Sequence, residues 1–309
     1  MMLKFMNFLL WGLVLLGAGC ASTPVNSEPE IILVGGATGR QGNAVVDELL
    51  ARGYRVRGLT RKPGGKKAQR LKDKGVELVQ GNYADSDSLL NAMDGIERMF
   101  FYSGFSRDEA AEGANVVAAA KASGIKQLVY SSGAAANPEN GLQGAAKMQV
   151  ELTIIGSGIP YTVFRPVAFM ENFDRQQSRF ASQGITDSRD PERVLHFISI
   201  TDIGFLVGEA FDDPGQWLNR AENVASDKMT VEEYVATFRN VMGQDIAYNQ
   251  VPLDEYLAIL PKPLRPLFRW YDEEGYDADV VGLRAKYTNL TTLDSYLRAT
   301  GWDNWQPVK

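Results

Sequence analysis

Over the first half of the chain, short apolar runs alternate with longer segments in which apolar residues recur at helical spacing. Most of the runs are bounded by Gly, Ser or Pro, and they lie at residues 31–34, 54–60, 76–80, 98–102, 127–130 and 161–165. The helical segments lie at residues 43–52, 86–93, 108–123 and 143–156. Strands and helices that alternate in this way predict an α/β fold, a doubly wound parallel sheet with helices on both faces.

The second half of the chain is less regular and has shorter predicted elements. Thr230 and Glu233 form a capping-box pattern, which predicts a helix that ends near Gly243. The other predicted elements are a strand at 194–198, a helix at 202–211, a strand at 246–251 and a short aromatic helix at 267–271. We therefore predict a main sheet over residues 31–170 and a smaller C-terminal α/β lobe over residues 171–309, interleaved with that sheet.

The first predicted strand ends at a glycine-rich turn, and the first predicted helix follows at once. Gly36, Gly39 and Gly42 have the spacing G-x-x-G-x-x-G, which differs from the dinucleotide fingerprint G-x-G-x-x-G. Gly36 permits a tight turn, Gly39 lets the backbone approach a pyrophosphate, and Gly42 lets the helix lie close to the sheet. The helix N-terminus offers free N–H groups to phosphates. The turn therefore predicts a nucleotide site at the carboxyl ends of the strands.

Basic residues follow the second predicted strand, where an NAD site usually has an Asp or Glu for the ribose 2′-hydroxyl. Here the chain has Arg61 and Lys62, followed by Lys66 and Lys67. Cations at this position would attract a 2′-phosphate, which favours NADP(H) over NAD(H). The alternative is a solvated basic loop with no ligand.

Composition and charge exclude several classes of function. The chain has 309 residues and a net charge of −6, so it has no basic surplus for general nucleic-acid binding. Cys20 and His196 are the single cysteine and the single histidine, which rules out an intramolecular disulfide and a Cys/His zinc site. His196 lies in an alternating strand pattern, which favours a structural role over a catalytic one.

Residues 1–20 have the pattern of an export signal. Lys4 precedes an apolar run at 8–16, and three small residues then lead to Cys20. The segment resembles a bacterial lipoprotein signal, in which Cys20 would be acylated; the alternatives are an ordinary cleaved signal, giving a secreted or periplasmic protein, and an uncleaved transmembrane anchor. Residues 21–30 lack periodicity and predict a flexible tether. We therefore expect an exported domain tethered to a membrane of the cell envelope, although nicotinamide cofactors are mainly cytoplasmic.

Three motifs together resemble the NmrA-like family of atypical short-chain dehydrogenases/reductases. Residues 36–42 read GATGRQG, residues 161–166 read YTVFRP followed by FMEN at 169–172, and residues 198–204 read ISITDIG. The order and separations of the three motifs are those of the family. The resemblance covers about residues 31–302 and implies a Rossmann-type domain with a smaller substrate lobe.

The resemblance also implies NADP(H) as the cofactor, a small-molecule substrate and a set of site residues. The dinucleotide phosphates would contact Gly36, Thr38, Gly39, Arg40, Gln41 and Gly42. The 2′-phosphate would meet Arg61, with Lys62 beside it. Asn82 and Tyr83 would border the adenine, and Tyr102 and Ser103 would follow the cofactor across the sheet. The nicotinamide end would lie near Lys147, Pro166 and Val167.

One departure from the catalytic short-chain reductases concerns the Tyr-x-x-x-Lys pair, whose tyrosine donates a proton. Gln143 stands at the tyrosine position, and Lys147 is retained. The family includes members that use the lysine alone and members that bind NADP(H) without turnover. Lys147 is thus either catalytic or anchors the cofactor; the alternative is a surface lysine paired with Glu151 at i,i+4.

Other hydroxyl groups lie near the predicted strand ends. Tyr102, Tyr130 and Ser132 could act there, and Ser132 follows the fifth predicted strand, where catalytic relatives place their serine. A serine that caps the end of a strand is an equally good interpretation of Ser132.

These observations leave three functional hypotheses. The first is an NADPH-dependent reductase of a small organic substrate. The second is a module that binds NADP(H) without catalysis and senses redox state or binds a protein partner. The third is a tethered scaffold that has lost cofactor binding, against which the intact glycine turn and Arg61 speak.

Overall fold

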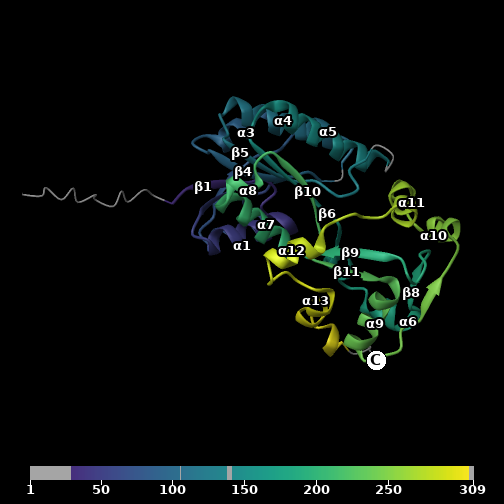
Figure 1. Ribbon diagram of the computed structural model, residues 1–309. Helices are drawn as coiled ribbons and strands as arrows, with labels where there is room; N and C mark the ends of the chain where they lie inside the picture. Colours follow the sequence, from purple (N-terminus) through teal and green to yellow (C-terminus); the bar gives the residue numbers. More distant parts are fainter. Residues whose placement is uncertain (1–28, 105, 138–140, 306–309) are drawn as a thin grey trace, which may run out of the picture.

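The computed structural model describes residues 29–104, 106–137 and 141–305, except for the side chains of residues 141–143 (Figure 1). The predicted signal with Cys20, and residues 21–28 of the predicted tether, lie outside the described residues. Glu30, at the end of that tether, is held against the fold, because its carboxylate pairs with Arg98 and its carbonyl accepts from the Arg55 N–H at 3.0 Å. No helix within the described ranges is long and apolar enough to cross a membrane.

A seven-stranded parallel sheet forms the larger lobe, with strand order β10-β6-β5-β4-β1-β2-β3. Its strands are β1 (Ile31–Val34), β2 (Arg55–Thr60), β3 (Glu77–Gln80), β4 (Arg98–Tyr102), β5 (Gln127–Ser131), β6 (Tyr161–Pro166) and β10 (Arg220–Val224). The first six confirm the predicted strands to within one residue at every end. Strand β10 was not predicted; it is an edge strand of mostly polar residues, paired with β6.

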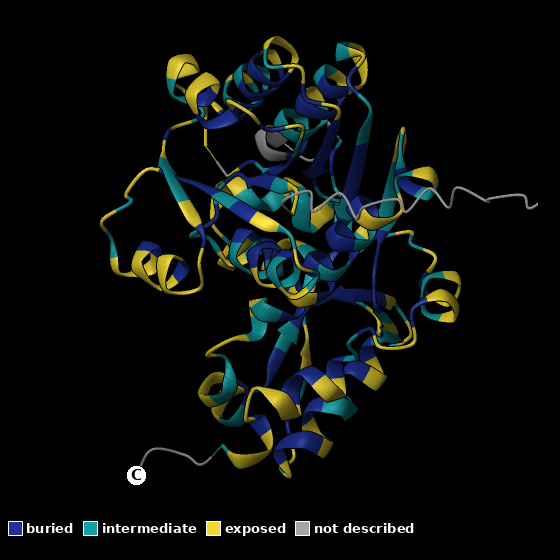
Figure 2. Ribbon diagram, turned by 90° about the vertical axis from the view of Figure 1, so that its left-hand side faces the viewer, coloured by how far each residue is buried: buried dark blue, intermediate teal, exposed yellow. Residues whose placement is uncertain are grey.

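Helices cover both faces of this sheet, as predicted (Figure 1). One face packs against α1 (Arg40–Ala51), α2 (Lys66–Asp73) and α7 (Ile200–Asp212). The other face packs against α3 (Ser86–Met93), α4 (Glu109–Ala122) and α5 (Gly141–Ser157). Buried residues are concentrated in the central strands and alternate with exposed residues along the outer helices (Figure 2). Helix α2 was not predicted from the sequence.

The smaller lobe has its own apolar core, formed around two short sheets of order β11-β9-β7 and β12-β8. The strands are β7 (Ala168–Phe169), β8 (Ile185–Asp187), β9 (Val194–Ile198), β11 (Asp227–Thr230) and β12 (Tyr248–Gln250). The other helices of this half of the chain are η2 (Met170–Phe173), α6 (Gln177–Gln183), α9 (Val231–Met242), α10 (Leu253–Ile259), η3 (Lys262–Leu264), α11 (Arg265–Glu273), α13 (Leu293–Ala299) and η4 (Trp302–Asn304). Helices α8 (Pro214–Trp217) and α12 (Val280–Lys286) instead contribute Trp217 and Val280 to the core of the main sheet.

Two local predictions in this half of the chain are confirmed. Thr230 and Glu233 form the reciprocal capping box of α9, and Gly243 ends that helix in the left-handed conformation at φ +64°. The aromatic helix predicted at 267–271 is the centre of α11. The predicted strand at 246–251 is shorter, because only residues 248–250 pair with β8.

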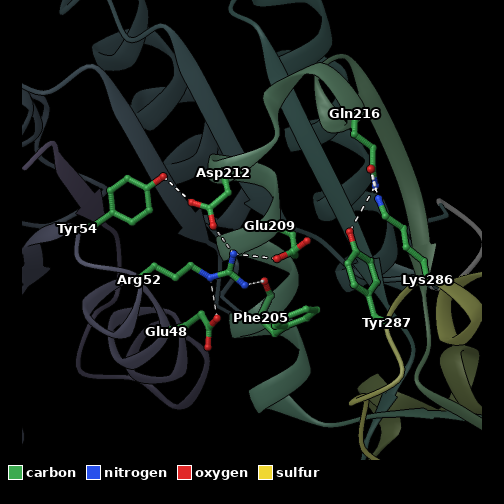
Figure 3. A network of polar contacts seen from close by, with 9 residues as sticks. All are labelled: Glu48, Arg52, Tyr54, Phe205, Glu209, Asp212, Gln216, Lys286 and Tyr287. Carbon is green, nitrogen blue, oxygen red and sulfur yellow. Dashed lines mark hydrogen bonds and ion pairs between the residues drawn. The ribbon is translucent and has the colours of Figure 1, made fainter.

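Helices α1 and α7 pack unusually closely, and this contact brings a segment of the second half onto the main sheet. A Cβ at Gly204 would lie 2.8 Å from the Ala44 carbonyl oxygen of α1, so only glycine fits there. At the far end of α1, the Arg52 guanidinium bridges Glu48 at 2.7 Å and Glu209 at 2.8 Å, and it also pairs with Asp212 (Figure 3). This network fixes α7 against α1.

We expect Arg52→Met to lower the free energy of unfolding by about 1.5–3 kcal/mol, the cost of losing hydrogen bonds to charged groups. The variant would leave three neighbouring carboxylates without their shared cation. Urea denaturation measures the difference. The matched control is Lys126→Met, which removes an exposed pair with Glu97 and should change stability by less than about 0.5 kcal/mol. Equal stability of the two variants would contradict the structural role of the network.

Candidate functional site

The glycine turn joins β1 to α1 at the carboxyl edge of the main sheet. Gly36 has φ +64°, which side-chain-bearing residues rarely adopt, and its carbonyl accepts from the Gly39 N–H at 2.8 Å. A Cβ at Gly42 would lie 2.3 Å from the Gly36 carbonyl oxygen. Gly42 therefore lets the helix close onto the turn itself, whereas the sequence analysis expected it to contact the sheet.

The N-terminus of α1 is open to an anion. The helix begins at Arg40, three residues earlier than predicted, and its N-cap residue Gly39 supplies no side-chain cap. The first-turn N–H groups and the positive end of the helix dipole therefore face the carboxyl edge of the sheet. A phosphate at this place would receive the hydrogen bonds that a capping side chain otherwise provides.

Tyr102, at the end of β4, lies across the turn. A Cβ at Gly39 would be 1.8 Å from the Tyr102 hydroxyl oxygen, and that hydroxyl donates to the Gly36 carbonyl at 3.4 Å. Burial raises the pKa of Tyr102, so the hydroxyl stays protonated at neutral pH. Of the three candidate hydroxyl residues, Tyr102 is the one in contact with the glycine turn.

The basic residues lie beside the turn. Thr38 Oγ1 is 3.4 Å from Thr60 Oγ1, which also accepts from the Lys62 N–H at 3.3 Å. These contacts bring the end of β2, with the exposed residues Arg61 and Lys62, next to the predicted phosphate site.

A cavity of about 560 Å³ opens on this side of the turn, and Thr38, Gly39 and Arg40 line it together with Lys67 and Arg70 of α2. Lys66 and Lys67 lie in helix α2 and not in a loop, whereas their role in binding a 2′-phosphate stays a prediction. The sequence analysis missed Arg70. Its spacing of three residues from Lys67 on a helix would have placed both cations on one face.

Two side chains of the GATGRQG motif are fixed by other parts of the chain. Gln41 Oε1 accepts from the Ser131 hydroxyl at 2.7 Å, which ties the first turn of α1 to the end of β5. The Arg40 guanidinium reaches the smaller lobe, where it donates to the Glu171 carbonyl at 3.3 Å and lies 3.7 Å from Asp174. The phosphate contacts that the resemblance implies for both residues stay predictions.

Asn82 and Tyr83 follow β3, on the adenine side implied by the resemblance. Asn82 is exposed, whereas the Tyr83 hydroxyl is buried behind the glycine turn, 2.4 Å from where a Cβ of Gly35 would lie. The Tyr83 ring packs edge-on against Phe101, and burial raises the pKa of Tyr83. Tyr83 thus forms part of the wall behind the turn, and its predicted adenine contact is untested.

Lys147 does not have the partner that its sequence neighbours suggest. Its ammonium group lies 2.9 Å from Glu109 Oε1, and the Lys147 side chain is only 12% exposed. The alternative of a surface lysine paired with Glu151 is therefore wrong. Glu109 is fully buried and also accepts from the Ser103 hydroxyl at 2.6 Å, whose oxygen lies 2.7 Å from the Tyr130 hydroxyl. Lys147, Glu109, Ser103 and Tyr130 form one buried cluster, which we call the lysine cluster.

The sequence analysis missed Glu109. An acidic residue in the first turn of a helix normally only complements the helix dipole, so Glu109 gave no signal of its own. Gln143, the residue at the tyrosine position, has a side chain outside the described part of the structure. Its identity alone shows that no tyrosine stands four residues before Lys147.

Glu151 instead belongs to a second polar cluster. Its carboxylate receives the Arg165 guanidinium through bonds of 2.9 and 2.5 Å and the Ser132 hydroxyl at 2.5 Å. Glu151 is buried, and the Arg165 pair raises the pKa of the guanidinium. The Ser132 hydroxyl is thus committed to Glu151, which favours the structural interpretation of Ser132. The partner of Glu151 is thus the arginine of the YTVFRP motif.

Pro166 is the last residue of β6, and Val167 follows it. Both are buried, and the Pro166 carbonyl accepts from the Ala134 N–H at 2.9 Å. His196 lies in β9, where burial lowers its pKa and keeps it neutral at pH 7. The predicted nicotinamide contacts of Pro166 and Val167 stay predictions.

The parallel sheet, the glycine turn and the uncapped helix at its carboxyl edge define an NAD(P)-binding Rossmann-type protein. The model of the NmrA-like family matches residues 28–297, and the chain therefore belongs to the NmrA-like family. This confirms the resemblance and the predicted fold. An NmrA-like family domain-containing oxidoreductase of Aspergillus hancockii is 30% identical over 257 residues, which cover 73% of this chain and 76% of the relative.

Solved structures share the fold at lower identity. The NADPH-dependent quinone oxidoreductase QOR2 of Escherichia coli, complexed with NADPH, gives a TM-score of 0.77 at 22% identity, over 87% of this chain and 99% of that chain. The negative transcriptional regulator NmrA, complexed with NADP, gives a TM-score of 0.75 at 20% identity, over 88% and 95% of the two chains. The same fold thus occurs in an oxidoreductase and in a transcriptional regulator.

Proposed function

We propose that the protein binds NADP(H) at the glycine turn and uses it to reduce a small organic substrate. The residues present fit such a cofactor. Gly39 gives the turn no side chain and lets the Tyr102 hydroxyl lie against it, and the uncapped α1 N-terminus supplies N–H donors. Arg61 and Lys62, with Lys67 and Arg70 of the neighbouring cavity, supply cations for a 2′-phosphate. The complexes of the two solved relatives with NADPH and NADP support the same assignment.

The lysine cluster is the observation that carries the proposal of a reductase. A buried ion pair contributes little net stability, because desolvation of both charges offsets their attraction. Its presence at the carboxyl edge of the sheet, where ligands bind in such folds, therefore points to a function. The similarity of the chain to oxidoreductases of the same family supports the same class of activity.

When bound, NADPH would supply a hydride to the substrate. Lys147 would hold a proton at Nζ, close to the ribose and the reacting group, and would donate it where negative charge develops. Glu109 keeps the ammonium in place, and the buried residues Pro166 and Val167 would exclude water from that end of the site. Gln143, which stands at the tyrosine position, cannot take over the proton transfer, because its amide does not ionise near neutral pH.

We expect Lys147→Ala to lower kcat/KM for NADPH-dependent reduction by at least about a hundredfold, because removal of a general acid usually lowers the rate by that factor. The assay follows NADPH consumption with a panel of carbonyl, quinone and enone substrates. Lys121→Ala, which removes an exposed lysine of α4, is the matched control and should keep the wild-type rate. Full turnover by the Lys147 variant would exclude the assigned role.

The alternative function is a non-catalytic NADP(H) sensor or regulatory module. Gln143 in place of the tyrosine favours it, and so does the fold shared with the regulator NmrA. Arg40 joins the glycine turn to Glu171 and Asp174 of the smaller lobe, so a ligand at the turn could change how the lobes contact each other. A sensor would bind NADP(H) tightly, change conformation on binding, and show no turnover with any substrate of the panel. The membrane tether through Cys20 stays a prediction from the sequence.

A further inference from the structure

The hydrogen bonds of the lysine cluster have a fixed direction. The single proton of Ser103 Oγ goes to Glu109 Oε1 at 2.6 Å, so the bond between Ser103 and Tyr130 must be donated by the Tyr130 hydroxyl. Burial raises the pKa of Tyr130, which keeps that hydroxyl protonated. Tyr130 therefore donates to Ser103, Ser103 donates to Glu109 Oε1, and the Lys147 ammonium donates to the same Oε1 at 2.9 Å.

This arrangement stabilises an ionised carboxylate in a place without solvent. Glu109 is 0% exposed, and Oε1 receives both a neutral and a charged donor. Glu109 Oε2 is also buried and has no hydrogen-bond partner among the described residues. Glu109 thus supplies a full negative charge, and Lys147 is the cation that lies against it.

We propose that Glu109 is the positioning residue of the site, holding Lys147 as a charged ammonium aimed along the path of the cofactor. The inference deepens the proposed function, because it rests on Lys147 meeting the nicotinamide end of NADP(H). Glu109 acts through Lys147 and needs no contact with the ligand. Ser103 and Tyr130 fix the carboxylate in turn, and the Ser103 carbonyl lies 3.5 Å from the same ammonium group.

The neighbouring cluster offers a matched comparison within the same fold. Glu151 is equally buried and lies one helical turn from Lys147, but its charge is taken by Arg165. Both carboxylates are thus buried members of an ion pair, and only Glu109 contacts Lys147. A general effect of removing a buried charge would appear in both variants, whereas a positioning effect would appear only at Glu109.

The test is the pH dependence of NADPH binding to the full-length protein, followed by NADPH fluorescence in wild type, Glu109→Gln and Glu151→Gln. The glutamine amide of the first variant keeps an acceptor for Ser103 but removes the counter-charge, and burial then favours the neutral form of the lysine as pH rises. From pH 7 to pH 9 we expect the affinity of Glu109→Gln for NADPH to fall about tenfold more than that of wild type. This factor corresponds to the loss of one charge-assisted hydrogen bond to the cofactor. Glu151→Gln should follow the wild-type pH profile.

A second variant separates charge from folding. Glu109→Asp keeps the carboxylate and should restore the wild-type pH profile, and thermal unfolding of each variant shows that it is folded. The proposal is overturned if Glu109→Gln binds with the wild-type profile, if it loses the same factor at every pH, or if Glu109→Asp fails to restore the profile. Failure of the wild-type protein to bind NADPH at any pH is a different result, which would overturn the proposed function itself.

Discussion

Gly42→Ala is expected to remove NADPH binding and to lower the free energy of unfolding by about 1–3 kcal/mol, the cost of overpacking a close contact. The added Cβ would lie 2.3 Å from the Gly36 carbonyl oxygen and 2.9 Å from the Ala37 Cα. Both neighbours are backbone atoms, so the turn itself must move. Because the same turn carries Gly39 and the first N–H groups of α1, its displacement disrupts the predicted phosphate site.

The matched control is Gly156→Ala in α5. A Cβ at Gly156 meets nothing within 4 Å, and the residue lies in a helix, where alanine is favoured over glycine. The control should bind NADPH as wild type does and be equally stable or slightly more stable. Urea denaturation and NADPH titration measure both properties. Normal NADPH affinity in Gly42→Ala would contradict the assignment of the phosphate site to this turn.

Arg61→Ala is expected to lower the affinity for NADPH at least about tenfold while leaving the affinity for NADH unchanged. The reason is that NADPH differs from NADH by its 2′-phosphate, and a hydrogen bond between charged groups contributes about 1.5–3 kcal/mol. Arg61 is exposed at the end of β2, beside Thr60 and the glycine turn.

Arg298→Ala provides the control for net charge, because it also removes one exposed arginine, in this case from α13 in the smaller lobe. It should alter neither affinity. An equal loss of both cofactors in Arg61→Ala would show a general role at the turn. If NADPH affinity is unchanged in Arg61→Ala, the 2′-phosphate must be held by other cations, and the candidates are Lys62 beside Arg61 and the cavity residues Lys67 and Arg70.

The parts of the fold that local patterns determine were predicted well. Each of the first six strands is an apolar run next to Gly, Ser or Pro, and the α9 capping box needs only residues three apart. Strand β10 was missed because its place in the sheet depends on pairing with β6, far away in the sequence. Helix α2 was missed because six of its eight residues are polar, and only Ala68 and Leu71 are buried.

The site shows the same division between local and long-range information. The glycine turn and the basic end of β2 are local, and the structure brings them together as expected. The alternative that paired Lys147 with Glu151 came from i,i+4 spacing, and it is wrong, because Glu151 pairs with Arg165 and Lys147 pairs with Glu109 of another helix. The i,i+4 spacing rule considers only partners on the same helix, so it could not show that Lys147 pairs with Glu109 and not with Glu151.

The most direct test of the central claim is a titration of the full-length protein with NADPH and with NADH, followed by cofactor fluorescence. If the glycine turn and the basic residues beside it form an NADP(H) site, NADPH should bind saturably and at least about tenfold more tightly than NADH, the margin of one charge-assisted bond. No saturable binding of either cofactor would contradict the account, and tighter binding of NADH would contradict the role of the basic residues after β2.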